Sequence, residues 1–296
     1  MFRLETEQLE KWTDLAQRVR KEIVSNVHDA QGGHIGGSLS VVELLIALYF
    51  KIMRIDPQNP DWEDRDRFIL SKGHASIGLY TVLAERGFFQ TQELCSFDVC
   101  GSRMQAHPCM LVTPGIDMST GSLGQGLSAG AGIALGAKLF KKNFLTYVMI
   151  GDGEAQEGQI WEAIMMASHY RLDNLITIMD YNKVQLYGHQ KPTPTPPLTD
   201  AKAKFEAFGW HTLEIDGHNY QAILDACQEA KETKGVPTMI IADTIKGKGV
   251  SFMEGRYEWH AKVPSDEECQ MALKELDCLP RKCPPGELVK EVLSND

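Results

Sequence analysis

Two polar side chains follow two apolar runs of the sequence, each at the point where the run stops. Asp152 stands between two glycines directly after residues 145–150, and Asn182 closely follows residues 175–180. If the two runs are adjacent parallel strands, their carboxyl ends meet at one sheet edge, about 4.8 Å apart. Carboxylate and amide oxygens are ligands of hard cations, so this pair predicts a site for Mg²⁺ or Ca²⁺. A strand-end turn with a solvated aspartate is the alternative, and the paired asparagine favours the metal site.

The glycines around Asp152 indicate what the cation would carry. Mg²⁺ readily shares its coordination shell with phosphate oxygens, and Gly151 and Gly153 let backbone amides approach such oxygens. The dinucleotide pattern GxGxxG is absent, GSLGQG at residues 121–126 has a different spacing, and KGKG at 246–249 lacks the ending of a Walker loop. The sequence therefore favours a metal-bound phosphate ligand over a Rossmann dinucleotide.

The elements that must position these residues alternate between strand and helix. Apolar runs predict strands at residues 67–71, 145–150, 175–180, 211–216 and 238–243. Helices are predicted near residues 9–27, 156–170 and 219–233. A strand, a helix and a strand over residues 145–180 form a βαβ unit, whose two strands run parallel. The predicted fold is α/β, a doubly wound, mainly parallel sheet flanked by helices.

Two shorter patterns concern the ends and the packing of helices. Ser40 and Glu43 form a capping-box pattern for the helix that follows them. Gly126, Gly130 and Gly136 recur in the helix after GSLGQG and predict that its backbone packs closely against a neighbour.

Composition and charge exclude several classes of function. Of the 296 residues, 43% are hydrophobic and 24% are charged, as in ordinary globular chains. The net charge of −10 argues against nucleic-acid binding, which favours a basic surface. No apolar run approaches the roughly 20 residues that span a bilayer, and the start lacks an apolar signal core, so we expect a cytoplasmic protein without membrane contact. The seven cysteines form no CxxC pair, which favours reduced thiols over disulfides or a metal site. Residues 1–265 are expected to form one domain, with residues 266–296 as a helical tail of the same unit.

Five ordered motifs carry a resemblance to a known family. They are GGHIGGSLS (32–40), SKGHAS (71–76), AHPCMLVTPGIDMSTGSLGQG (106–126), GDGEAQEGQIWEA (151–163) and WHAK (259–262). GDG followed by Asn182 resembles the thiamine diphosphate binding motif, and the five motifs together resemble the N-terminal, diphosphate-binding half of transketolase. The resemblance implies a subunit of a thiamine diphosphate- and Mg²⁺-dependent transketolase, which transfers a two-carbon ketol unit from a ketose to an aldose.

The resemblance also implies roles for residues of these motifs. The metal ligands would be Asp152, Asn182 and the carbonyl of Val184, holding Mg²⁺, for which Ca²⁺ can substitute. The residues implied to contact the cofactor are His74, Gly121, Leu123, Gly151, Gly153, Asn182 and His260. The residues implied to be catalytic, in a reaction that passes protons to and from sugar hydroxyls, are His34, His107 and His260. Glu157 and Glu162 are implied to lie near a subunit interface, as a proton relay between two active sites.

A transketolase of the usual length continues into a pyrimidine-binding domain and a C-terminal domain, whereas this sequence stops at Asp296 with neither. The second half of the family's chain supplies the glutamate that hydrogen-bonds the aminopyrimidine and the arginines that grip substrate phosphates. The resemblance therefore implies one subunit of a split enzyme, an α2β2 heterotetramer completed by a transketolase C-terminal subunit with the pyrimidine-binding domain. Its substrates would be sugars or sugar phosphates, and the chain alone is expected to be inactive.

The segment after Asn182 departs from the family, which more often has an Asp-Gly pair and a longer acidic loop there. Tyr187 and His189 are therefore expected to alter the rim of the site and its substrate choice, next to a stiff loop, PTPTPP, at residues 192–197. Two alternatives stay open: the α subunit of a 2-oxo acid dehydrogenase, and a non-catalytic regulatory subunit that binds cofactor or partner. Glu154 receives no role. The histidines expected to be structural are His28, His169, His189, His211 and His218.

Overall fold

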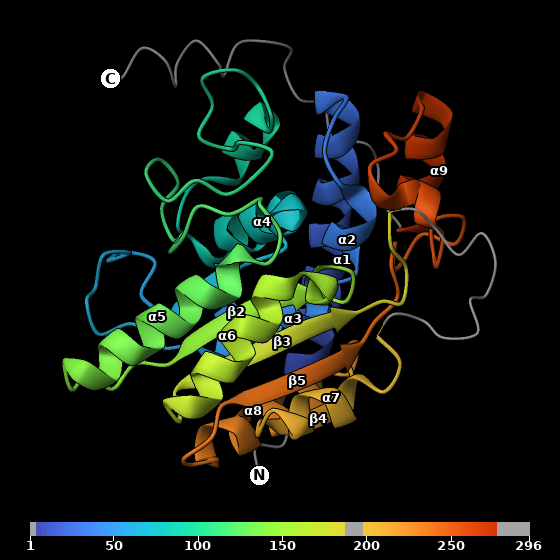
Figure 1. The fold of residues 1–296 in the computed structure, drawn as a ribbon. Coiled ribbons are helices and arrows are strands. Elements are labelled where there is room, and N and C mark those ends of the chain that lie inside the picture. Colours follow the sequence, from blue (N-terminus) through green and yellow to red (C-terminus); the bar gives the residue numbers. More distant parts are fainter. Residues whose placement is uncertain (1–3, 187–197, 277–296) are drawn as a thin grey trace.

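The fold is built around one parallel sheet (Figure 1). The structure is a computed structural model that describes residues 4–186 and 198–276. The strands are β1 (Arg67–Leu70), β2 (Thr146–Gly151), β3 (Leu175–Tyr181), β4 (His211–Asp216) and β5 (Thr238–Asp243). They pair in the order β1-β2-β3-β5-β4, and every neighbouring pair is parallel. The predicted doubly wound, mainly parallel sheet is confirmed, with each predicted strand close to its expected bounds.

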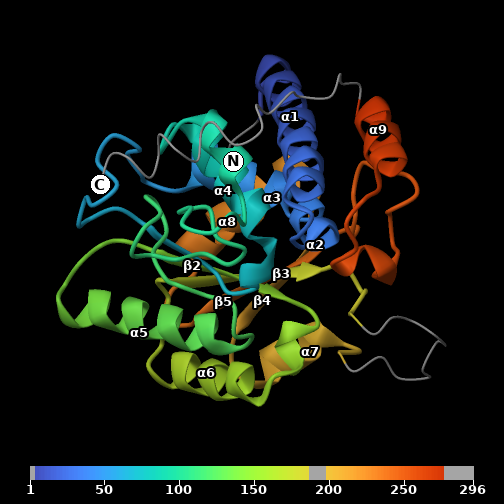
Figure 2. The same cartoon turned by 90° about the horizontal axis from the view of Figure 1, so that it is seen from above.

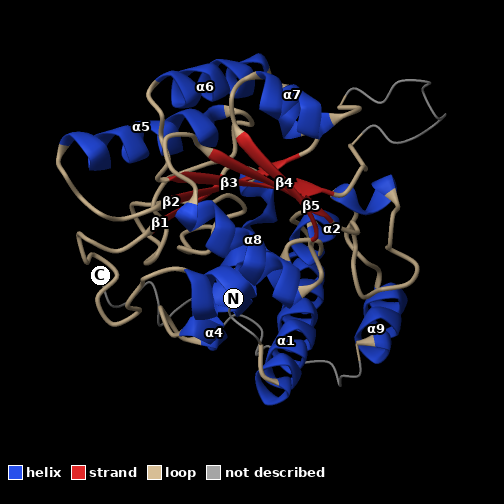
Figure 3. Ribbon diagram, turned by 90° about the horizontal axis from the view of Figure 1, so that it is seen from below, coloured by secondary structure: helices blue, strands red, loops and turns tan. Residues whose placement is uncertain are grey.

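Helices cover both faces of the sheet. They are α1 (Thr6–Ala30), α2 (Ile35–Leu39), α3 (Val42–Ala47), α4 (Ser76–Arg86), α5 (Gln125–Leu139), α6 (Gly158–His169), α7 (Ala201–Ala207), α8 (Tyr220–Glu232) and α9 (Asp266–Glu275). Figures 2 and 3 show α5, α6 and α7 on one face, and α1, α4 and α8 on the other. The helix α6 connects β2 to β3, and α7 connects β3 to β4 at the edge of the sheet. The helix α8 then connects β4 to β5 in the opposite direction across the sheet. Right-handed crossovers in opposite directions place their helices on opposite faces, so this topology accounts for the two layers.

The central strands are apolar because both of their faces are covered. Every residue of β2 is buried, whereas in β4, at the sheet edge, only Thr212 is buried and the other residues are partly or fully exposed. Tyr147 and Met149 of β2 pack into the core that includes α1, α3 and α8, and Val148 and Ile150 pack into the core that includes α5 and α6. The strand is thus held from both sides, which fixes the position of its carboxyl end.

Two of the three glycines predicted to pack closely in α5 do so. A Cβ added to Gly126 would lie 2.4 Å from the Ser71 hydroxyl oxygen, and one added to Gly130 would lie 2.3 Å from a methyl carbon of Val148. The prediction is wrong for Gly136, where an added Cβ would meet nothing within 4 Å. Six residues after Gly130, Gly136 is turned by about 240° around the helix axis, so it does not face the sheet.

The predicted capping box at Ser40 and Glu43 is wrong. No side chain caps the N-terminus of α3. Ser40 donates instead to the Asp180 carboxylate at 2.7 Å, and Glu43 pairs with Arg20 and His218. Both side chains are buried, and contacts to distant parts of the chain satisfy them in place of the helix end.

The helix α9 packs beside α1 and begins the predicted tail (Figure 1). Residues 277–296 lie outside the described residues, and so do PTPTPP, Tyr187 and His189, so what the sequence predicts for them stays a prediction. The division into a domain and a tail of the same unit likewise stays a prediction. Within the described ranges, no helix combines the length and the apolar character needed to cross a membrane.

Candidate functional site

Four histidines from four separate segments form a cluster. His34 precedes α2, His74 lies in the short turn before α4, His107 lies in the long loop before α5, and His260 ends the short helical turn before α9. The ring centroid of His34 lies 5.2 Å from that of His74 and 6.0 Å from that of His107. The ring of His260 lies 5.2 Å from His34 and 5.1 Å from His74. The structure thus brings together the four histidines that the sequence analysis assigned to one site.

The predicted metal ligands lie at the carboxyl ends of β2 and β3, which are paired neighbours in the sheet. One carboxylate oxygen of Asp152 accepts the Lys183 N–H at 2.6 Å, and the amide oxygen of Asn182 accepts the Val184 N–H at 3.1 Å. These contacts hold three oxygen donors around one short turn: the Asp152 carboxylate, the Asn182 amide oxygen and the Val184 carbonyl.

This donor set suits a hard cation whose shell is completed by a ligand. Within the described part of the chain, no group of three or more His, Cys, Asp or Glu side chains could hold a metal ion. One carboxylate, one amide and one carbonyl leave coordination positions for phosphate oxygens and water, which is the way Mg²⁺ is usually bound next to phosphates. The residues therefore fit a metal that arrives with a phosphate-bearing cofactor.

The surroundings of Lys246, in the segment after β5, also indicate an anionic ligand. Its side chain is buried, and its ammonium group donates to the Val184 carbonyl at 3.3 Å and to His260 Nδ1 at 2.8 Å. Neither partner carries a negative charge, and the described residues offer Lys246 no ion pair. Burial, followed by the charge of Lys72, lowers the pKa of Lys246 to about 8. A buried ammonium group is costly unless an anion compensates it, so this position fits a diphosphate.

A buried ion pair lies beneath the turn that carries the predicted metal ligands. The side chains of Lys72 and Asp180 are 2% and 0% exposed, and the ammonium group donates to the carboxylate. Asp180 also accepts from Ser40, from the Asn182 amide nitrogen at 2.9 Å, and from the Thr244 hydroxyl. Burial acts to raise the pKa of Asp180, but the charge of Lys72 and these hydrogen bonds outweigh it and lower the pKa. Because the amide nitrogen of Asn182 is held by Asp180, its oxygen remains directed to the turn.

Three histidines of the cluster, His34, His74 and His260, have lowered pKa values and therefore favour the neutral imidazole. Burial, followed by the charges of His107 and Lys246, lowers the pKa of His34. Burial and neighbouring cationic groups lower the pKa of His74 well below its ordinary value. Burial and the charge of Lys246 lower the pKa of His260 to about 3. A neutral imidazole can accept a proton, and the buried Nδ1 of His34 has no hydrogen-bond partner among the described residues. That nitrogen is therefore an unsatisfied buried polar atom.

The glycines beside Asp152 shape the turn. The Gly153 N–H donates to the Asp152 carboxylate at 2.8 Å, and the Gly151 N–H donates to Glu154 at 3.1 Å. Glu154 also accepts the Gly124 N–H at 2.9 Å, and it is buried. Glu154, to which the sequence analysis gave no role, thus ties the turn after β2 to the loop before α5. In the chain itself both predicted phosphate-binding amides are engaged by carboxylates.

The remaining predicted residues lie near the mouth of the site or on α6. Gly121 has a φ of +146°, and an added Cβ would lie 3.0 Å from the ring of His107. Leu123, on the same loop, is 38% exposed. Glu157 precedes α6 and Glu162 lies within it, and both are exposed. The structure therefore places the two glutamates on the surface and apart from the histidine cluster.

Three residues of the site, Lys72, Asp180 and Lys246, had not been singled out, and a fourth, Glu154, had been given no role. Each lies inside or beside a stretch that the sequence analysis quoted: SKGHAS, GDGEAQEG, the apolar run 175–180 and KGKG. The available signal was a charged residue at the end of a buried strand or within a glycine-rich segment. Charged side chains are mostly exposed, so only their burial in the structure reveals the role.

Residues 12–287 match the family described as Transketolase, thiamine diphosphate binding domain. The chain is 47% identical to the 6-deoxy-6-sulfo-D-fructose transketolase subunit of Clostridium sp. (strain MSTE9), over 88% of this chain and 94% of that protein. It is 41% identical to an apulose-4-phosphate transketolase subunit of Phocaeicola vulgatus, over 88% of this chain and 92% of that protein. It is 38% identical to human transketolase, over 91% of this chain but only 42% of the human protein.

Solved transketolases share the fold. The transketolase from Leishmania mexicana superposes with a TM-score of 0.84 at 30% identity, over 96% of this chain and 44% of that one. The transketolase from Campylobacter jejuni superposes with a TM-score of 0.85 at 30% identity, over 95% of this chain and 45% of that one. This chain spans less than half the length of these solved enzymes. By fold, site and sequence, the chain belongs to the transketolase thiamine diphosphate binding domain family.

Proposed function

We propose that this chain is the diphosphate-binding subunit of a two-chain transketolase, which uses thiamine diphosphate and Mg²⁺ to transfer a two-carbon ketol unit from a ketose to an aldose. The observation that carries the proposal is the position of three oxygen donors, on Asp152, Asn182 and Val184, beside the uncompensated ammonium group of Lys246. A metal-bound diphosphate satisfies both, because the oxygens bind the cation and the ammonium group binds the anion. Ca²⁺ can substitute for Mg²⁺ in such a donor set.

The histidine cluster supplies the proton chemistry. When bound, thiamine diphosphate supplies the carbon nucleophile for ketol transfer. His260 accepts from Lys246 at Nδ1, which leaves its Nε2–H as a donor on the other side of the ring. The lowered pKa of His34 favours its neutral imidazole, which suits the ring to accept a proton from a sugar hydroxyl and to return it. His107 lies beside His34 and has the same role at the mouth of the site, while His74 packs against both His34 and His260.

The partner and the substrate are part of the proposal. Two relatives that match nearly their whole length are named as transketolase subunits, which supports a partner subunit. We propose that this partner is a C-terminal subunit with the pyrimidine-binding domain and that the assembly is an α2β2 heterotetramer. Their names state a sulfonated and a phosphorylated sugar, which supports an anionic sugar as the substrate. The exposed Glu157 and Glu162 on the α6 side would form the proton relay at the subunit interface.

The test is ketol transfer by the purified chain with and without a co-purified partner, in the presence of Mg²⁺ and thiamine diphosphate. We expect negligible transfer by the chain alone, because loss of acid–base assistance costs roughly 10²–10⁴ in rate, and restored transfer with the partner. Robust turnover by the chain alone would refute the requirement for a partner. Decarboxylation of pyruvate by the pair would instead support the 2-oxo acid dehydrogenase alternative, which the family match and the names of the relatives disfavour. His107→Ala in the assembled pair tests the regulatory alternative, since a regulatory subunit would tolerate this change.

A further inference from the structure

The segment that carries Lys246 is held from the side opposite to the histidine cluster. Gly247 and Gly249 have φ values of +76° and +95°, so the backbone around Lys246 follows a path that favours glycine. Such a backbone is intrinsically permissive, and the ammonium group stands on a flexible four-carbon chain. External contacts must therefore fix where the Lys246 ammonium group lies.

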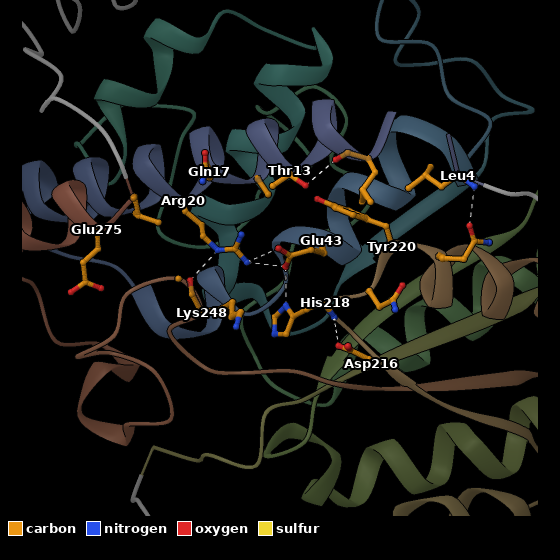
Figure 4. A pocket seen from close by; sticks show the side chains of 16 residues that line it. Leu4, Thr13, Gln17, Arg20, Glu43, Asp216, His218, Tyr220, Lys248 and Glu275 are labelled. Carbon is orange, nitrogen blue, oxygen red and sulfur yellow. Dashed lines mark hydrogen bonds and ion pairs between the residues drawn. The ribbon is translucent and has the colours of Figure 1, made fainter. Parts of the chain in front are cut away.

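Backbone hydrogen bonds from Gly247 to Gly36 and from Gly255 to Lys246 hold this segment, and three mostly buried side chains add to them. We call these side chains the Arg20–Glu43–His218 triad (Figure 4). Glu43 accepts from Arg20 at 2.8 Å and pairs with His218 Nδ1 at 2.9 Å. The N–H of Ile245 donates to His218 Nε2 at 2.9 Å, and Arg20 Nε donates to the carbonyl of Lys248 at 2.9 Å. Because Nε2 accepts, the proton of the imidazole is on Nδ1 and points to Glu43. The triad thus holds the backbone on both sides of Lys246.

The triad lies in a different region of the molecule from the histidine cluster. It lines a cleft of about 680 Å³ together with Thr13, Tyr220 and other residues, none of which belongs to the cluster. Figure 4 shows Arg20 coming from α1, Glu43 from α3 and His218 from the turn before α8. The charged groups are nearly buried, with side chains 7% to 14% exposed. Among the described residues, the hydrogen bonds of the triad reach Ile245 and Lys248 and not the histidine cluster, so the triad acts on the site through the segment that it holds.

We propose that His218 is a positioning residue for Lys246: the triad fixes the backbone at Ile245 and Lys248 so that the Lys246 ammonium group meets the diphosphate. The inference rests on the proposed function, because it assigns the diphosphate to Lys246. A purely structural role is the competing explanation, since buried ion pairs also affect stability. The two explanations differ in one respect: a positioning residue loses its effect on cofactor affinity when Lys246 is absent.

A double-mutant cycle measures that difference. Thiamine diphosphate is titrated by calorimetry, in excess Mg²⁺, into the full-length chain assembled with its co-purified partner, for the wild type, His218→Ala, Lys246→Met and the double variant. We expect His218→Ala to weaken binding about tenfold and Lys246→Met to weaken it by up to about a hundredfold, from the loss of a neutral and of a charge-assisted hydrogen bond. The double variant should bind no more weakly than Lys246→Met alone, which is the signature of residues that act as one unit.

His211 provides a matched control. It pairs with Glu229 at 2.9 Å, as His218 pairs with Glu43, but it lies at the opposite end of β4. His211→Ala should leave the affinity for thiamine diphosphate unchanged. Excess imidazole should restore tight binding to His218→Ala, because the cleft gives access to the vacated position.

Each result separates the explanations. The positioning role is overturned if the losses of affinity for thiamine diphosphate in the two single variants add in the double variant. It is also overturned if His218→Ala binds the cofactor as tightly as the wild type and has only a lower free energy of unfolding. If His218→Ala does not fold, His218→Gln replaces it in the cycle, and the same additivity decides. If the wild-type chain assembled with its partner binds no thiamine diphosphate, the proposed function fails and this inference fails with it.

Discussion

Replacing Asp152 by asparagine should make the metal-free chain more stable and abolish its response to Mg²⁺. Burial, followed by the charge of Asp180, raises the pKa of Asp152 from 3.8 to about 6. A raised pKa means that the folded chain disfavours the charged carboxylate, at a cost of about 1.36 kcal/mol per unit. Above pH 6 the folded chain therefore carries a penalty of about 3 kcal/mol at this position.

The change to asparagine removes that penalty but also loses a contact. Asp152 accepts from the backbone N–H groups of Gly153 and Lys183, whereas the single acceptor oxygen of asparagine replaces only one of these bonds, at a loss of about 1 kcal/mol. We expect a net gain of about 2 kcal/mol in the free energy of unfolding at pH 8. The wild-type carboxylate takes up a proton as the pH falls through 6, so the gain should shrink to below about 1 kcal/mol at pH 5.

Urea unfolding in a chelator and in Mg²⁺ is the assay. Mg²⁺ at a hundredfold excess over its dissociation constant should stabilise the wild type by about 2.7 kcal/mol and leave Asp152→Asn unchanged. Asp243→Asn is the control, because Asp243 forms an exposed ion pair with Lys183 and its loss should cost less than about 1 kcal/mol. A metal-free Asp152→Asn chain that is less stable than the wild type, or an equal response of both to Mg²⁺, would refute the reasoning.

Two further predictions concern the packing of α5 and the charge beneath the site. Gly130→Ala should lower the free energy of unfolding by about 1–3 kcal/mol, because the added Cβ would lie 2.3 Å from Val148, whereas Gly136→Ala meets open space and should raise it by about 0.5–1 kcal/mol. Asp180→Asn should cost about 3–5 kcal/mol in urea unfolding, because it leaves the ammonium group of Lys72 buried without a counter-charge.

Each of these two predictions can be contradicted by a specific result. Equal effects of the two glycine substitutions would show that α5 does not pack as the structure places it. Lys72→Met combined with Asp180→Asn removes both charges and should be more stable than Asp180→Asn alone. A double variant as unstable as the single one would show that the missing hydrogen bonds to Asp180, and not the unpaired charge, cause the loss.

Much of the site could be predicted because its anchors lie at strand ends. A buried central strand is a continuous apolar run, so its last residue is visible in the sequence, and polar residues directly after it lie at the ligand-binding edge. Asp152 and Asn182 were found in this way, and the strand pairing confirms that they follow adjacent strands. The grouping of His34 and His107 with them came from the resemblance of the motifs.

Local patterns failed where a distant contact competed with them. Ser40 and Glu43 have the spacing of a capping box, but Ser40 donates to Asp180, 140 residues away, and Glu43 pairs with Arg20 and His218. A side chain that is buried among such partners gains more from them than from an exposed helix end. Nothing in the spacing of the sequence indicates which partners the fold will bring to it.

The sequence by itself determined the strand and helix order, the strand-end positions of Asp152 and Asn182, and the family, because these depend on local periodicity and on contiguous motifs. The tertiary structure decided which charges are buried. Lys72 and Lys246 resemble surface lysines in the sequence, yet one neutralises Asp180 beneath the site and the other stands without an anion beside Val184. The difference is set by the dielectric surroundings and by contacts between segments far apart in the chain, and both arise only when the sheet and its loops are assembled.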